Sequence, residues 1–446
     1  MKRKDLTQGA VPLTLYQLTL PMVVGVLSMV AFNLVDTYFI GKLGKNELAA
    51  LSFTFPVILV IFSLVQGIGI GATALISRSF GANNLEKAAR ETTDSLFLAL
   101  LLVLIFVVIG LFTIDPLFTA LGATPEVLPL VREYMEIWYF TILFVIVPFV
   151  GNSAIRATGD TQTPSYIMLF AVLVNALLDP LLIFGWGPVP ALGLRGAALA
   201  TAISRGFTMI VSLYILRYRE QLITFVIPSR AVLFGCWQAI LYIGLPTGVS
   251  RMISPVAVGG VTALMATYGA DAVAAFGVGS RVEVLGMSVF FALSAAIAPF
   301  IGQNMGQKQW KRIQKAVNYS SVFSLIWGAG AALALWMLAN PVAALFTDNP
   351  EVTSQVSLYL SVIPISFGFQ GIYLIGNAGL NTLGKPLPAF FISLAQMFAF
   401  YLPLAYLGSH LNGISGAFLG IAVSYLPGAA IAFWVIRRFI NREINN

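Results

Sequence analysis

Long runs of apolar residues alternate with short polar segments along almost the whole chain. A transmembrane helix needs roughly 17–25 predominantly apolar residues, and twelve runs reach this length. They cover approximately residues 13–40, 48–75, 94–114, 130–151, 164–184, 195–217, 237–264, 273–297, 319–339, 357–378, 388–408 and 414–436. We therefore predict an all-α integral membrane protein with twelve transmembrane helices.

The composition agrees with this pattern. The 446 residues are 58% hydrophobic and only 10% charged, whereas about 25% of the residues in a soluble domain are charged. The single cysteine, Cys236, excludes an intrachain disulfide framework, and the single histidine, His410, argues against His-rich metal sites and Ser-His-Asp hydrolysis. The basic N-terminus precedes an apolar run that continues to about Ile40. This run is too long for a cleaved signal peptide, so we expect an uncleaved first helix.

The positive charges predict the orientation of the helices. If the N-terminus is cytoplasmic, 18 of the 25 Lys and Arg residues, Lys2, Arg3 and Lys4 among them, fall in inner segments, and only Lys42 and Lys45 fall in outer loops. Cytoplasmic loops carry such an excess of positive charge, so we predict that both termini are cytoplasmic. The net charge of +7 then reflects membrane topology, and we expect no nucleic-acid partner. We expect a multi-pass protein of the cell (inner, cytoplasmic) membrane.

The two halves of the sequence resemble each other. Pro21 and Pro246 lie in similar apolar segments, and Gly81 and Gly306 in similar polar segments, with a separation of 225 positions in both cases. Six is an even number of crossings, so both halves start on the same side of the membrane, as in transporters built from parallel repeats. We predict two pseudosymmetric six-helix lobes. They are an N-terminal lobe with a cation site at 1–217, a cytoplasmic linker at 218–236 and a C-terminal lobe at 237–446.

Polar residues within the apolar runs indicate a site in the first half. Asp36 lies near the outer end of the first predicted helix, and Asn175 and Asp179 lie in the outer half of the fifth. Their spacing of four places Asn175 and Asp179 on one helix face. At 1.5 Å per residue, Thr201 near the outer start of the sixth helix lies at a similar depth. Ionisable groups inside a membrane are costly and usually functional, so we predict a cation-coupling cluster of Asp36, Asn175, Asp179 and Thr201.

The residue types leave the identity of the ion open. Burial and a second carboxylate both disfavour the ionised form, so one aspartate can hold a proton. The same oxygen atoms can also cage Na⁺, which makes a sodium site at Asp36, Asp179, Asn175 and Thr201 the alternative. We expect no cofactor and no resident metal, only the transported H⁺ or Na⁺. A purely structural role, with the two aspartates bonded to nearby loops, also stays open at this stage.

The second half lacks these acids. The positions 225 residues after Asp36 and Asp179 hold Val261 and Leu404, which favours a dedicated coupling site in the first half. Glu283 is the notable acid in the second half, and we expect it to form a local ion pair with Arg281. Pro21, inside the first helix, is either a hinge that moves the helix of Asp36 or the cause of a static bend.

Several segments together resemble the multidrug and toxic compound extrusion (MATE) family. They are "LPM" at 20–22, "VDTYFIGKLG" at 35–44, "GNSAIRATGDTQTP" at 151–164 and "NALLDPLLIFG" with "LGLRGAALATAIS" at 175–204. The resemblance covers essentially the whole chain. The confinement of the two aspartates to the first half is similar to the DinF-like and archaeal-type branch.

The resemblance implies a monomeric transporter, not an enzyme, that exports drug-like and often cationic compounds. In that branch, aspartates of helices 1 and 5 form the cation site with an Asn of helix 5 and a Thr of helix 6. A helix 4 Asn and Tyr join this network, and they correspond here to Asn152 and Tyr134, although Asn152 falls near the inner end of its helix.

We therefore predict a secondary active multidrug exporter that exchanges amphipathic organic cations for H⁺ or Na⁺ across the lipid bilayer. Protonation of Asp36 and Asp179 would be coupled to bending of the first helix near Pro21. We expect the substrate cavity to include Met29, Phe32, Met168 and Val172. A flippase for lipid-linked saccharide precursors is the alternative. An intramembrane enzyme has less support, because it needs a nucleophile and a base on facing helices and the single histidine, His410, is expected in an outer loop. A channel has less support, because two pseudosymmetric lobes with one off-axis acidic site do not indicate a central pore.

Overall fold

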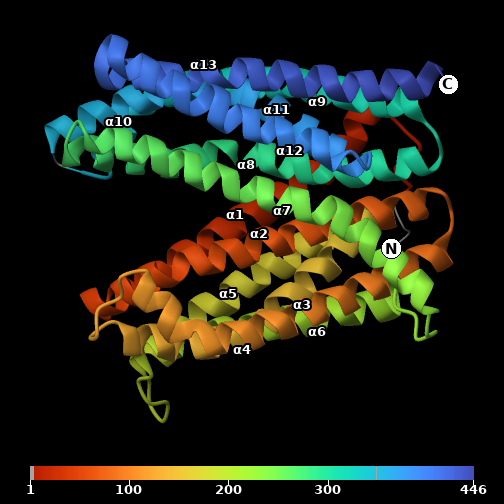
Figure 1. Ribbon diagram of the computed structural model, residues 1–446, viewed down its shortest axis with the longest axis horizontal. Coiled ribbons are helices and arrows are strands. Elements are labelled where there is room, and N and C mark those ends of the chain that lie inside the picture. The colour runs from red at the N-terminus through yellow and green to blue at the C-terminus, as the bar shows by residue number, and fades with distance from the viewer. Residues whose placement is uncertain (1–4, 348, 446) are drawn as a thin grey trace. The chain divides into compact units, whose positions relative to one another are not determined.

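The computed structural model describes residues 5–347 and 349–445, and these residues form helices joined by short loops (Figure 1). Lys2, Arg3 and Lys4, which contribute to the predicted inner charge, lie outside the described residues. The helices are α1 (Val11–Gly41), α2 (Lys45–Gly81), α3 (Leu85–Ala120), α4 (Leu128–Ala157), α5 (Gln162–Phe184), α6 (Gly193–Tyr214), the π-helix η1 (Ile215–Arg219), α7 (Arg230–Ala266), α8 (Ala270–Gly306), α9 (Trp310–Ala344), α10 (Pro350–Val362), the 3₁₀ helix η2 (Ile363–Ser366), α11 (Phe367–Thr382), α12 (Pro386–Leu394), the π-helix η3 (Ala395–Tyr401) and α13 (Leu402–Asn445).

The described helices provide the predicted twelve membrane crossings. Eleven continuous helical runs are long and apolar enough to span a bilayer, and the last of them, Pro386–Asn445, has 60 residues. Its backbone leaves the helical conformation at Asn412 and Gly413. The backbones at Leu404 and Gly420 are in close contact, because a Cβ atom added to Gly420 would lie only 2.0 Å from the Leu404 carbonyl oxygen. The chain therefore reverses direction at 412–413. This run is therefore an antiparallel pair of spans, and the prediction of an all-α protein with twelve transmembrane helices is confirmed.

The backbone repeats with the same period as the sequence. Asn83 and Lys308 are two of the three described non-glycine residues with positive φ, and they lie 225 positions apart. Gly44 pairs with Gly269, and Gly159 with Gly384, at the same separation and again with positive φ. A left-handed conformation costs a residue with a Cβ atom roughly 1–2 kcal/mol. Its recurrence at equivalent turns confirms that the halves share one architecture.

The described chain divides into two compact units. Unit 1 includes Val24–Gly248, and unit 2 includes Leu6–Val23 together with 249–445. The beginning of α1 therefore belongs to unit 2 and its end, with Asp36, to unit 1. The predicted functional division at 217 and 236 stays a prediction.

Each unit is built around one central helix. In unit 1, α4 packs against α2, α3 and α6, and in unit 2 the run α10–η2–α11 packs against α8, α9 and α13. These two runs are the most buried of the candidate spans, with 67% and 61% of their apolar windows inside the structure. They occupy equivalent places in the repeat but differ in one respect: α4 is a continuous helix, whereas its counterpart is interrupted by the 3₁₀ turn η2.

Candidate cation-coupling site

The polar face of α5 is buried in unit 1. Ile167, Ala171, Asn175, Asp179 and Ile183 are buried at intervals of four residues, which places them along one side of the helix. Asn175 and Asp179 have no exposed surface. The Asn175 side-chain amide donates a hydrogen bond of 3.1 Å to Asp179 Oδ1. The amide therefore orients the carboxylate within an otherwise apolar helix.

Asp36 and Tyr134 complete a cluster around Asp179. Asp36 comes from the last two turns of α1, and Tyr134 comes from the second turn of α4. The two carboxylates interact electrostatically with each other, and both interact with the buried Tyr134 hydroxyl. The structure therefore brings together residues 36, 134, 175 and 179 from three helices, and their role in coupling stays a prediction.

Three oxygen atoms in this cluster have unused acceptor capacity. Asp36 Oδ1, Asn175 Oδ1 and Asp179 Oδ2 are buried and accept no hydrogen bond from the described residues. Buried polar atoms in native proteins are nearly always satisfied. A proton on one of the aspartates, or a small hard cation, would satisfy them. The described residues contain no group of three or more His, Cys, Asp or Glu side chains placed to hold a metal ion, so a bound cation would also need amide or hydroxyl oxygens.

Arg205 of α6 is the positive charge beside this cluster. Its guanidinium carbon lies 4.1 Å from the centroid of the Phe32 ring, and it interacts electrostatically with Asp36. The described residues show no ion pair within 4.0 Å between Arg205 and a carboxylate. Because a guanidinium is always charged, Arg205 offsets part of the negative charge without neutralising it through a direct contact.

The other predicted site residues are less directly connected. Thr201 and Asn152 are buried, but no hydrogen bond of the described residues joins either side chain to an aspartate. Asn152 lies close to Ala157, where α4 ends, whereas Tyr134 lies near its beginning. This places Asn152 and Tyr134 toward opposite ends of the helix.

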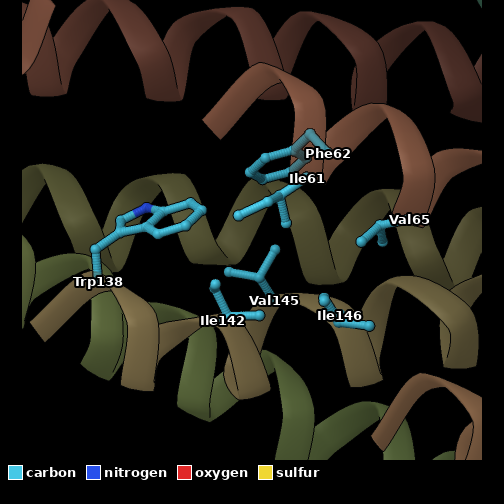
Figure 2. Close-up of a pocket in the computed structure, with 7 residues that line it drawn as sticks. All are labelled: Ile61, Phe62, Val65, Trp138, Ile142, Val145 and Ile146. Carbon is cyan, nitrogen blue, oxygen red and sulfur yellow. The ribbon is translucent and has the colours of Figure 1, made fainter. Parts of the chain in front are cut away.

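The predicted substrate-facing residues lie on α1 and α5, the helices that carry the two aspartates. Met29, Met168 and Val172 are partly buried, and Phe32 is buried beneath Arg205. Their contribution to a substrate cavity stays a prediction. A small hollow in unit 1 lies instead between α2 and α4, where the side chains point toward one another (Figure 2). Its lining carries no ionisable group: Ile61, Phe62, Val65, Trp138, Ile142, Val145 and Ile146.

Pro21 does not break α1. The helix continues from Val11 to Gly41 through this residue. Proline still removes one backbone hydrogen bond, and Pro21 lies close to Val23 and Val24, where the chain passes from unit 2 to unit 1. The structure thus shows a weakened point in α1, and its use as a hinge stays a prediction.

The expected pairing of Glu283 with Arg281 is wrong. Arg281 is exposed, and Glu283 instead accepts hydrogen bonds from the Tyr359 hydroxyl and the Gln370 amide. Residues two apart on a helix point in different directions, which explains why the local pair does not form. The repeat contains the missed signal, because Tyr359 lies 225 positions after Tyr134.

Comparisons with known proteins agree with this architecture. A family model described as MatE matches residues 21–181 and 246–407. The chain is 35% identical to a protein of Shewanella oneidensis described as an FAD transporter, over 98% of this chain and 96% of the relative. It is 27% identical to the multidrug export protein MepA of Staphylococcus aureus, over 94% and 92%. The fold is similar to the crystal structure of the Vibrio cholerae MATE transporter VcmN in the bent form, with a TM-score of 0.92. The two sequences are 32% identical, and the match covers 97% of this chain and 98% of the VcmN chain.

Proposed function

Because the chain belongs to the MATE family of membrane transporters, we propose that it is an H⁺-coupled exporter of amphipathic organic cations in the cytoplasmic membrane. It is a transporter and not an enzyme. The observation that carries the coupling proposal is the cluster of Asp36 and Asp179, in which the buried atoms Asp36 Oδ1 and Asp179 Oδ2 accept no hydrogen bond from the described residues. We further propose that the monomer is the functional form.

The proposed cycle uses protonation of this cluster. A proton from the outside adds to Asp36 or Asp179 and removes one of two neighbouring negative charges. The protonated oxygen becomes a donor and can bond an oxygen that now has no partner, such as Asn175 Oδ1. The new hydrogen bond changes the contact between α1 and α5, and α1 bends near Pro21 and displaces the substrate. The cycle requires both ligands to bind the two conformations with different affinities. Na⁺ is the alternative coupling ion.

The relatives support two substrate classes. The Staphylococcus aureus relative is described as a multidrug export protein, which supports drug-like organic cations. The Shewanella oneidensis relative, described as an FAD transporter, makes FAD the second candidate. FAD carries phosphate charges, for which arginine is a suitable partner, and Arg205 is a partly buried arginine without an ion pair among the described residues.

The test is transport by purified full-length protein in liposomes. Vesicles receive a fluorescent organic cation, and a pH gradient and a Na⁺ gradient are applied separately to wild type and Asp36→Asn. We expect dye movement under the pH gradient alone and none with Asp36→Asn. Dye movement that depends only on the Na⁺ gradient would support the same coupling site but identify Na⁺, and not H⁺, as the coupling ion. Full wild-type transport by Asp36→Asn would overturn the proposed coupling site.

Parallel vesicles containing FAD separate the substrate classes. Gradient-dependent movement of FAD without movement of the dye would show that the substrate is a flavin dinucleotide and not an organic cation. If neither compound moves under either gradient, the exporter proposal fails, and lipid-linked saccharide precursors become the substrates to test.

A further inference from the structure

Unit 2 contains its own partly buried carboxylate, that of Glu283, which the proposed coupling site does not use. Glu283 of α8 accepts a hydrogen bond from the Tyr359 hydroxyl of α10 at Oε2. The Gln370 amide of α11 donates a second hydrogen bond, of 3.1 Å, to Oε1. Tyr359 and Gln370 are 2% and 6% exposed. One carboxylate therefore joins three helices in the interior of the unit.

The groups that face Glu283 are neutral. Besides Tyr359, the titratable groups in electrostatic range are Tyr401 of η3 and Tyr425 of α13. Arg281, on the same helix, is exposed, and Arg251 of α7 interacts with Tyr373. No Lys, Arg or His in the described part of the chain forms an ion pair with Glu283. A carboxylate in an apolar environment without a cationic partner is costly in its ionised form.

The neighbours of Glu283 favour a proton over a metal cation. Tyr359 and Gln370 both direct hydrogens toward the carboxylate, whereas Na⁺ or another hard cation requires several oxygen lone pairs. A proton needs no additional ligand. Hydronium supplies it: one O–H bond of hydronium breaks, one O–H bond forms on a carboxylate oxygen, and a water molecule is released.

The carboxylate also lies beside an interruption in the central helix of unit 2. The 3₁₀ turn η2 (Ile363–Ser366) separates α10, which carries Tyr359, from α11, which carries Gln370. Gln370 also donates a hydrogen bond of 3.0 Å to Ser366 Oγ, and Ser366 donates one of 2.8 Å to the Ile363 carbonyl. Glu283 is therefore linked to both sides of η2. Short 3₁₀ segments within longer helices often mark hinges.

We propose that Glu283 is a second proton-binding site, and that its protonation loosens the hydrogen bonds that hold α8 to both sides of η2. The neutral acid accepts weaker hydrogen bonds than the carboxylate, and its new O–H competes with the Tyr359 hydroxyl as a donor. Protonation then lets α10 and α11 move relative to each other about η2. Only the use of this movement in transport rests on the proposed function, because proton binding is measurable without substrate.

The test is infrared spectroscopy of the purified full-length protein during acidification. Protonation of a carboxylate produces a carboxylic-acid C=O band, and we expect one component of this signal to be lost in Glu283→Gln. In Tyr359→Phe the same component should remain but change frequency, because its hydrogen bond is lost. Glu136→Gln, which alters an exposed acid of α4, is the matched control and should leave the component unchanged. An unchanged C=O signal in Glu283→Gln would overturn the proposal.

Amide hydrogen exchange of η2 tests the second step. After correction for the intrinsic effect of pH, exchange in residues 363–366 should accelerate on acidification in wild type and stay constant in Glu283→Gln. Equal acceleration in both proteins would overturn the link between Glu283 and η2. The dye assay keeps the two proposals apart. If neither the dye nor FAD moves under either gradient in wild type, the exporter function is refuted, and proton binding at Glu283 can still be measured.

Discussion

The two units share a backbone plan but place their carboxylates differently. In unit 1, Asp36 of α1 and Asp179 of α5 lie together near Tyr134 of the central helix α4. In unit 2, the equivalent tyrosine, Tyr359, bonds Glu283 of α8. A tyrosine on the central helix is thus common to both units, whereas the acids come from different helices.

The positions of the unit 1 acids are apolar in unit 2. Val261, the counterpart of Asp36, is fully buried. The preceding Gly260 lies in α7 and Leu402 lies in α13. A Cβ atom added to Gly260 would lie 2.8 Å from Leu402 Cδ2, so α7 and α13 pack closely through apolar groups here. Leu404, the counterpart of Asp179 at the 225-residue separation, lies two residues after Leu402. The positions of the two aspartates in unit 1 therefore hold apolar residues in unit 2, where the neighbourhood of Val261 is packed by van der Waals contacts.

The largest loss of transport should follow the removal of Asp179, the second aspartate of the cluster in unit 1. Asp179→Asn keeps the size of the side chain and an oxygen that can accept the Asn175 hydrogen bond, but it cannot bind a proton. We expect pH-driven dye movement to fall to the level of protein-free liposomes while the protein stays folded by size-exclusion chromatography. Asp115→Asn is the control, because Asp115 is 43% exposed in a surface ion pair with Arg132. Loss of transport in both variants, or in neither, would contradict a specific role for Asp179.

A smaller effect should distinguish the two equivalent prolines. Pro21→Ala restores a backbone N–H and allows the missing helical hydrogen bond to form, so α1 becomes stiffer. We expect several-fold slower transport with Pro21→Ala and nearly normal transport with Pro246→Ala, because α1 carries an acid of the cluster and α7 does not. The initial rate of dye movement measures the difference. Equal rates in the two variants would favour a static bend at Pro21.

The smallest effect should be a difference in thermal stability between the variants of the two equivalent tyrosines, Tyr359→Phe and Tyr134→Phe. Tyr359→Phe leaves a buried Glu283 oxygen without its donor, at a cost of about 1–3 kcal/mol. Tyr134 donates no hydrogen bond to an aspartate among the described residues, so Tyr134→Phe should cost less. Thermal unfolding of the detergent-solubilised proteins near neutral pH compares them. A larger loss of stability in Tyr134→Phe would show that its hydroxyl has the stronger partner.

The sequence by itself determined the membrane architecture. Apolar runs of bilayer length leave the chain few alternatives, because lipid provides no hydrogen bonds for an unpaired backbone. The turn at Gly413 and the repeated positive-φ turns at Asn83 and Lys308 follow the boundaries and the period that the apolar pattern sets. The grouping of Asp36, Asn175 and Asp179 was also predictable, because helical rise and spacing fix depth and facing direction.

The partners of individual charged groups were decided only by the tertiary structure. Neighbours along the chain suggested an ion pair between Glu283 and Arg281, yet the bonds go to Tyr359 and Gln370, which lie 76 and 87 positions away. The same holds for Arg205, which lies over the Phe32 ring. Such contacts depend on the rotation and packing of whole helices against each other, because many residues together set the position of each helix. The pattern of apolar and polar residues in the sequence predicts the depth of a polar group in the membrane. Which polar groups contact each other at that depth is determined only by the packing of the helices.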